Sequence, residues 1–365
     1  MASTLAAARE RISQLDIEIE KLQRLMDPFL AERKKCQQVL ADYTYPILTL
    51  PTEITSEIFL QFLPSYPHRP NAIGSQSPSL LLQICRQWHD VALTTPALWS
   101  TLELLLDYGG SHAQQRDLLD VWLRRSATCP LSIRLDCSEE LADDDDEGPS
   151  IVFGFVDSLL CHAMRWQDME FVLPFECLRK IAGSMPLLRR VTIGIANGPV
   201  SPETPAVLFT DAPVLNHVVL DGSFNPFAVQ LPWSQITTLT AEALYANEAF
   251  EILLHGTMLQ DCTLRLLNGE PWTDSSVPPL PLRSLRLENL GGGTDQLRRF
   301  FKALHLPLLQ TLAVHEFFLG PDPIAALSGV CPERYPREIE IFCAHASRGI
   351  YAGAFPLASL SIHKF

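Results

Sequence analysis

Several residues capable of catalysis or metal binding occur in this sequence, but none stands in a catalytic or ligand spacing. His162 follows Cys161, His315 ends an apolar run, and four aspartates occupy Asp143–Asp146. The alternating ligands and turn glycine of a calcium-binding loop are missing around these aspartates. Gly291–Gly293 lacks the lysine and spacing of a phosphate-binding loop. The sequence therefore predicts no enzyme, no cofactor and no metal site.

The nine cysteines form no disulfide or metal-binding framework. Their number is odd, they are scattered from Cys36 to Cys343, and no CxxC pair occurs. Free cysteine in apolar stretches behaves as a small hydrophobe, although spacing alone does not exclude a cysteine nucleophile. The sequence has no apolar core of a signal peptide and no run of about eighteen apolar residues. We therefore expect a soluble protein of a reducing compartment, cytoplasmic or nuclear, without a membrane partner.

The negative charge is concentrated in one segment. The formal net charge is -14, and eight acidic residues and no basic one lie between Asp136 and Glu147. Because phosphate binding needs clustered lysine and arginine, this composition argues against a nucleic-acid partner. The acidic loop 136–149 is expected to be a solvated insertion or, alternatively, a docking site for a basic partner.

The last two thirds of the sequence repeat an apolar pattern. An apolar anchor residue is followed by apolar residues three and five places later, often with proline shortly before, as in PLLRRVTI from Pro186 and PLLQTLAV from Pro307. Successive anchors are 21 to 27 residues apart. They are Trp166, Leu188, Leu215, Ile236, Leu259, Leu282, Leu309, Pro336 and Leu357.

A period of this length built on LxxLxL is typical of a leucine-rich-repeat-like solenoid. Each repeat should add one strand to a parallel sheet, with the third and fifth residues after the anchor in the core. Intervening stretches such as 178–185 and 297–306 should form helices. The alternative is an ordinary alternating α/β domain whose strands happen to follow prolines. No repeat has asparagine or cysteine eight places after its anchor, so the ladder formed by such residues must be replaced or absent.

Residues two and four places after an anchor should leave the core. Because they mix charges and hydroxyl groups, they indicate a surface for a polar protein ligand. The candidate ligand-binding residues are Arg190, Thr192, His217, Thr238, Arg286, Glu338 and Glu340.

A small helical module precedes the repeats. Pro51 suits the first turn of a helix, and the apolar residues after it recur at helical spacing. A surface loop is expected from Ser65 to Pro78, because the apolar period is lost and three prolines occur. A second helical segment around Trp88 then ends at Pro96. Two or three short helices bury too little surface to be stable alone, so the module needs a partner surface.

The first forty-three residues carry a seven-residue apolar repeat. Residues from Leu5 to Leu40 alternate between the a and d positions of about five heptads, which predicts a coiled-coil-like helix. Pro28 should kink or stop this helix, and Arg33 places a charge on its apolar seam. Two interpretations stay open, namely self-association into a homodimer and a helical hairpin folded back on the chain.

The module resembles a known family. LPTEITSEIF, followed by LLLQICRQWHDVALTTPALWSTLEL, resembles the F-box, and the order of heptad helix, F-box and irregular repeats is similar to F-box-like proteins of mushroom-forming fungi. The expected fold is thus mixed α/β in three parts: a coiled-coil-like helix (1–43), an F-box-like module (44–105) and a leucine-rich-repeat-like solenoid (106–365). The long loop between the first two helices departs from compact F-boxes.

The resemblance implies a substrate-recognition subunit of an SCF-type (cullin-RING) ubiquitin ligase. The F-box would dock on the Skp-type adaptor, and the repeats would bind a protein substrate that the sequence does not identify. The implied adaptor-binding residues are Leu50, Pro51, Ile54, Ile58, Phe59, Leu82, Cys85, Trp88 and Leu98. Phe59 and Trp88 are the expected aromatic anchors, with packing inside the module as the alternative for each residue. The alternative function is a non-ligase interaction scaffold that dimerises through its N-terminal helix.

Overall fold

The chain divides into two compact units, Met1–Ile58 and Phe59–Phe365. The computed structural model describes residues 2–42, 46–65, 67–106, 111–137, 148–196, 207–209, 211–222, 226–267, 278–289, 294–319, 321–332, 336–343 and 359–364. Most of the acidic loop 136–149, Gly291–Gly293 and the anchor Leu357 lie outside these residues.

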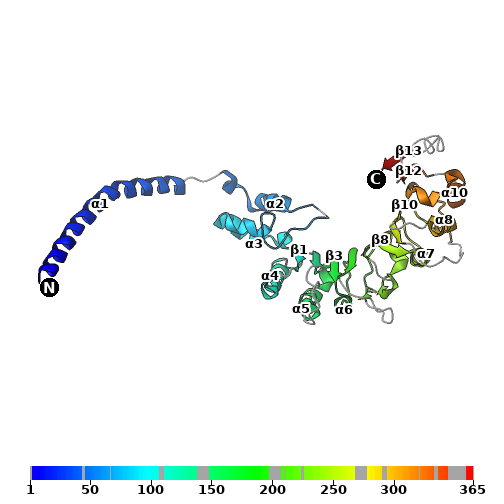
Figure 1. Cartoon of the computed structure of the whole chain (residues 1–365), viewed down its shortest axis with the longest axis horizontal. Coiled ribbons are helices and arrows are strands. Elements are labelled where there is room, and N and C mark those ends of the chain that lie inside the picture. Colours follow the sequence, from blue (N-terminus) through cyan, green and yellow to red (C-terminus); the bar gives the residue numbers. More distant parts are fainter. Residues whose placement is uncertain are drawn as a thin grey trace. The chain divides into compact units, whose positions relative to one another are not determined.

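The first unit consists mainly of one long helix. α1 (Ala2–Asp42) continues through Pro28, and Figure 1 shows it as a single bent helix. Proline removes one backbone hydrogen bond and commonly bends a helix without ending it. Of the two effects expected of Pro28, a kink or a stop, the stop is therefore absent, and residues 2–42 do not form a hairpin among themselves. The 3-10 helix η1 (Pro46–Thr49) and α2 (Thr52–Phe62) follow, and α2 continues into the second unit.

The second unit begins with the rest of the helical module. It contains η2 (Pro78–Gln83), α3 (Arg86–Leu93) and η3 (Pro96–Trp99). Ser77 caps η2 by accepting a hydrogen bond from the Ser79 backbone, and proline occupies the start of both η2 and η3. The indole N–H of buried Trp99 donates to the Ala92 carbonyl at 2.9 Å, so η3 is tied to α3.

The segment 65–78, expected to be a surface loop, is partly buried. The Pro70 carbonyl accepts a hydrogen bond from the Glu103 backbone at 2.9 Å, and Asn71 forms a parallel bridge with Glu103. The segment is a loop before Pro78 and most of its described residues are exposed, as expected, but its contact with the sheet edge was not predicted. Lost apolar periodicity reveals the absence of a helix but not whether the chain lies against a sheet edge. Its buried residues are Arg69, Pro70, Ala72, Ser77 and Pro78.

An open, wholly parallel sheet forms the body of the second unit. Its eleven strands pair in the order β1-β2-β3-β4-β6-β8-β9-β10-β11-β12-β13, so the order in space follows the chain. The strands are β1 (Thr101–Leu105), β2 (Leu131–Asp136), β3 (Trp166–Leu173), β4 (Arg190–Ile195), β6 (His217–Asp221), β8 (Thr238–Tyr245), β9 (Asp261–Leu267), β10 (Ser284–Asn289), β11 (Thr311–His315), β12 (Glu338–Cys343) and β13 (Ser359–Lys364). β5 (Val207–Leu208) and β7 (Val229–Gln230) form a separate two-stranded parallel sheet.

Helices connect the strands along one side of the sheet. Figure 1 shows the labelled helices from α4 onward on the outer side of the arc that the strands follow. The helices are α4 (His112–Arg125), α5 (Gly148–Leu160), α6 (Phe175–Leu178), α7 (Ala246–His255), α8 (Thr294–Ala303), α9 (Glu316–Leu319) and α10 (Pro323–Val330), with 3-10 turns η5 (Ala163–Arg165), η6 (Pro226–Ala228) and η7 (Trp233–Gln235). The expected helix over 297–306 is largely confirmed by α8, whereas α6 ends at the first residue of 178–185.

A tight turn before the strands explains the prolines. The anchor N–H donates to the carbonyl three residues earlier, and proline fills the second position of such turns because its fixed φ suits that position. These bonds join Leu188 to Met185, Leu215 to Ala212 and Leu309 to Leu306 at 3.1, 3.1 and 3.4 Å, around Pro186, Pro213 and Pro307. In these repeats the proline, the turn and the first residue of the strand therefore occur at matching positions in the sequence.

Neighbouring repeats are joined at this edge by backbone groups. The Arg189 carbonyl accepts hydrogen bonds from the backbone of Asn216 and His217, both at 3.1 Å, and the Gln260 carbonyl accepts from Arg283 and Ser284 at 2.7 and 2.9 Å. A side-chain ladder of asparagines is not needed for these bonds.

The core lies on the helical side of the sheet. All eight described anchors are buried, and so are the third and fifth residues after each of them. Val191 and Ile193 of β4, for example, are fully buried. The sequence-based prediction of one continuous parallel sheet with alternating buried residues is thus confirmed.

Candidate interaction surfaces

The adaptor-binding candidates of the first unit are largely solvent-exposed. Ile54 and Ile58 of α2 are 50% and 43% exposed. Their four-residue spacing puts them on the same side of the helix. Pro51 is exposed and Leu50 is half-buried. An exposed apolar pair on a short helix is suited to contact a partner.

The candidates of the second unit mostly pack inside the chain. Phe59 is 1% exposed and Leu98 is fully buried, so the expectation that these two contact a partner is corrected in favour of internal packing. The Phe59 and Trp88 rings pack edge to face with their centres 5.0 Å apart. Trp88 is half-buried, as are Leu82 and Cys85. Among the described residues, the buried Trp88 Nε1 has no hydrogen-bond partner.

The seven ligand-binding candidates lie off the core on the sheet. The strand register aligns Arg190 with His217 and His217 with Thr238. It likewise brings Glu338 and Glu340 beside β11. Arg190 and Glu338 are exposed, and the others, Thr192, His217, Thr238, Arg286 and Glu340, are half-buried. The sheet thus carries them across neighbouring strands, although those of β4 and β12 are several strands apart.

A charge cluster covers the first strands of this face. We define the proximal cluster as Arg69, Glu103, Arg134, Asp136, Asp168, Glu170 and Arg190. Arg69 donates to Asp168 at 3.0 Å, to Glu170 at 2.8 Å and to Ser132 at 3.1 Å. Arg134 binds Asp136 at 2.8 Å and Glu170 at 3.1 Å. Since the Arg69 side chain is only 4% exposed, this guanidinium is a buried link between segment 65–78 and the sheet.

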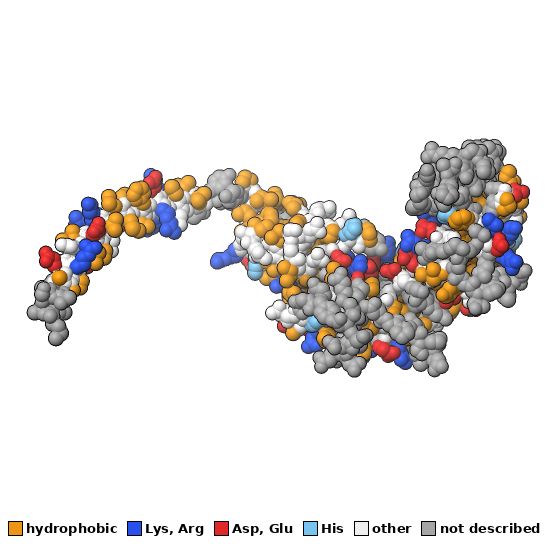
Figure 2. All heavy atoms as spheres, in the orientation of Figure 1, with side chains coloured by type: hydrophobic (Ala, Val, Ile, Leu, Met, Phe, Trp, Pro, Cys, Tyr) orange, Lys and Arg blue, Asp and Glu red, His pale blue; other side chains and the backbone are white. Residues whose placement is uncertain are grey.

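A second charge cluster lies farther along the sheet. We define the distal cluster as Glu242, Arg265, Arg286, Glu288 and Glu340. Arg265 binds Glu242 and Glu288, both at 2.8 Å, while Arg286 reaches Glu288 at 3.4 Å and Glu340 at 3.1 Å. Figure 2 shows acidic and basic side chains side by side on the second unit. These pairs are more exposed than Arg69, so each contributes less to stability.

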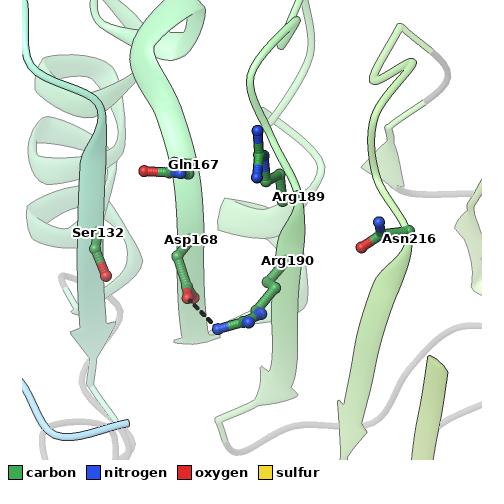
Figure 3. A pocket seen from close by; sticks show the side chains of 6 residues that line it. All are labelled: Ser132, Gln167, Asp168, Arg189, Arg190 and Asn216. Atoms are coloured by element: carbon green, nitrogen blue, oxygen red, sulfur yellow. Dashed lines mark hydrogen bonds and ion pairs between the residues drawn. The ribbon is translucent and has the colours of Figure 1, made fainter. Parts of the chain in front are cut away.

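An open pocket of about 370 Å³ adjoins the proximal cluster where the strands begin. In Figure 3 its labelled side chains come from neighbouring strands, and Asp168 and Arg190 point toward each other. Their ion pair measures 3.5 Å. The lining residues are Ser132, Gln167, Asp168, Arg189, Arg190 and Asn216. Of these, sequence reasoning singled out only Arg190.

The surroundings of the pocket shift the pKa values of Asp168, which lines it, and of His217 nearby. Burial raises the pKa of Asp168 above its usual value, although Arg69 and Arg190 act in the opposite direction. Burial, followed by the charge of Arg190, lowers the pKa of His217. At neutral pH His217 is therefore uncharged, and the positive charge beside Asp168 comes from arginine.

The sequence was compared with known proteins. No protein-family model matches this chain. No curated protein matches it either.

In the described part of the chain, no helix is long and apolar enough to cross a membrane, and no group of three or more histidine, cysteine or acidic side chains is placed to hold a metal ion. Burial raises the pKa of Cys177 and Cys262 to about 12, so these thiols stay protonated and poorly nucleophilic.

Sequence reasoning missed the residues that organise the pocket. Arg69 lies between prolines in a segment without periodicity, so nothing local marks it as buried. Arg189 carried a usable signal, because it directly follows the anchor Leu188 and the repeat pattern places it at a strand start. Asn216 holds the same position in the next repeat.

Proposed function

We propose that this protein is a substrate-recognition subunit of an SCF-type ubiquitin ligase. Its F-box-like segment would dock on a Skp-type adaptor, and its leucine-rich-repeat-like sheet would bind a protein substrate. Such a subunit supplies no catalytic group, because holding a substrate near the transferring machinery raises the rate by proximity. The cullin ligase would be the remaining partner.

The exposed pair Ile54 and Ile58 is the observation that carries the adaptor-docking part. Stable interfaces bury about 800 Å² per partner around a few apolar or aromatic anchors. Because Phe59 and Leu98 are buried inside the chain, we assign the contact with the adaptor to the exposed side of α2.

The sheet face supports the substrate-binding part. Its two charge clusters and the hydroxyl side chains between them form a polar surface suited to another protein. Opposite charges paired at 2.8 to 3.5 Å limit nonspecific attraction of polyanions, since each arginine of the two clusters already has acidic neighbours.

A pull-down of the full chain with the Skp-type adaptor tests the proposal. Wild type should bind, and Ile54→Asp with Ile58→Asp should weaken binding at least about 30-fold, because losing an interface anchor costs about 2 kcal/mol or more. Ile324→Asp is the matched control, since Ile324 is 45% exposed on α10. Circular dichroism checks folding of each variant. The proposal fails if wild type does not bind the adaptor.

A non-ligase scaffold that dimerises through α1 is the second candidate. Its support is the apolar seam of α1, on which Leu22, Met26 and Phe29 are 54%, 55% and 70% exposed. A folded chain showing dimerisation without adaptor binding would favour this candidate.

A further inference from the structure

The pocket at the strand starts is lined mainly by side chains that can donate hydrogen bonds. Arg189 and Arg190 contribute guanidinium groups, and Gln167 and Asn216 contribute side-chain amides. Ser132 accepts a bond from Arg69, which leaves its hydroxyl hydrogen able to donate. Such a lining suits a ligand group made of acceptor atoms.

The charge balance of the pocket also favours an anion. Its one carboxylate, Asp168, already binds buried Arg69 at 3.0 Å and Arg190 at 3.5 Å. The Arg189 side chain is exposed and has no ion pair among the residues that the structure describes. One positive charge therefore remains for an incoming group.

We propose that this pocket binds a single carboxylate group of a protein ligand, through the Arg189 guanidinium with help from the Asn216 amide. Planar guanidinium groups bind the two oxygens of a carboxylate side by side. A phosphate dianion fits less well, because Asp168 in the lining repels a second negative charge. The inference rests on the proposed function only in taking the ligand to be a protein.

Carboxylate can come from a chain end or from an acidic side chain, so the test separates the two. The full chain is passed over four immobilised degenerate heptapeptide pools. The first has a free C-terminal carboxylate and no acidic residue, the second an amidated end and one central glutamate, the third an amidated end and no acid, and the fourth an amidated end and one central phosphoserine. The first or second pool should retain at least about 10-fold more protein than the third, since bonds to charged groups contribute about 1.5–3 kcal/mol.

Variants connect retention to the pocket. Arg189→Gln should lower retention by the carboxylate pool about 10-fold. Asp168→Asn should preserve or increase it, because a like charge is removed while a hydrogen-bonding side chain remains. Arg283→Gln is the matched control, since Arg283 directly follows the anchor Leu282, as Arg189 follows Leu188, and is likewise exposed but lies outside this pocket.

Three results would overturn the inference. The first is that all four pools retain the protein equally or that none retains it. The second is stronger retention by the phosphoserine pool than by the carboxylate pools. The third is that Arg189→Gln binds the carboxylate pool as strongly as wild type does. The same variants are assayed for adaptor binding, which Arg189→Gln should leave intact. If wild type does not bind the adaptor, the ligase proposal is refuted, but the peptide experiment still decides whether the pocket binds a carboxylate.

Discussion

At the scale of single residues, Arg69 has the most consequential position in the second unit. Its side chain is 4% exposed, and its guanidinium binds Ser132, Asp168 and Glu170, which lie on β2 and β3. A buried charge is tolerated only when it is paired and hydrogen-bonded. Arg69 thus fixes segment 65–78 to the sheet, and it does so beside the pocket.

Replacing Arg69 should destabilise the protein in a pH-dependent way. Arg69→Met leaves two largely buried carboxylates without their common partner, and we expect a loss of about 3 kcal/mol in the free energy of unfolding at pH 7. The pKa of Asp168 is already raised by burial, and without Arg69 it should rise further. The native state then binds a proton more tightly than the unfolded chain, so stability falls as pH rises.

Urea unfolding at two pH values measures this effect. The loss caused by Arg69→Met should be clearly smaller at pH 4 than at pH 7, because protonated Asp168 carries no unpaired charge. Arg265→Met is the control, since Arg265 pairs with Glu242 and Glu288 but is 39% exposed, and it should cost at most about 1 kcal/mol. Equal losses at both pH values would contradict the role assigned to Asp168.

Residues of this kind show where sequence reasoning stops. The exposed positions of Ile54 and Ile58 agree with their expected use, but Phe59 has the same apolar character and is buried. Helical periodicity identifies the apolar side of a helix and not which of its residues the chain itself covers. Arg69 is a stronger case, because its partners lie 63 to 101 residues away in sequence.

At the scale of elements, the repeat unit is a turn, an anchor and a strand. Leu308 and Leu309 are adjacent leucines in one such unit, yet Leu308 is 47% exposed and Leu309 is 1% exposed. The turn closed by the bond from Leu309 to Leu306 directs the second leucine into the core. The difference between the two residues is therefore set by register and not by residue type.

This pair gives a direct test of the repeat register. Leu309→Ala should lower the free energy of unfolding by about 2–5 kcal/mol, because it removes buried methyl groups and leaves a cavity. Leu308→Ala should stay within about 0.5 kcal/mol of wild type. Chemical denaturation of the two variants provides the measurement. Similar losses for both would show that the anchor register is misplaced.

The strand pattern was predictable for the same reason. Anchor spacing, proline position and period-two burial are local signals, and they identified the strands of the large sheet from β3 to β12 and their order, but not β5 and β7 of the small sheet. Helix bounds were less accessible, as the four-residue α6 illustrates, because a short helix against a sheet depends on packing rather than on propensity. Predicting the pocket would have required knowing which strands lie side by side, because its lining residues come from different strands.

At the scale of the whole molecule, the long helix α1 determines whether the protein is a monomer. Figure 2 shows apolar side chains along this helix, and all described residues from Ala7 to Leu40 are exposed. In the heptad assignment, Arg11 is at g and Asp16 at the following e. A parallel copy would therefore bring Arg11 of one chain near Asp16 of the other, with no like-charged e–g pair. A second copy of this chain accordingly suits the seam.

We expect the full chain to be a parallel dimer at tens of micromolar. Light scattering should give twice the chain mass for wild type and the monomer mass for Ile19→Asp combined with Leu22→Asp, because buried aspartates oppose the seam. Lys21→Asp, off the seam, should remain dimeric.

Cys36 is exposed and at a d position, so mild oxidation should cross-link a parallel in-register dimer, and Cys36→Ser should abolish the cross-link. An antiparallel pair would place Cys36 near the other end of its partner helix and prevent this bond. A monomer mass for wild type would instead remove the support that α1 gives to the scaffold candidate.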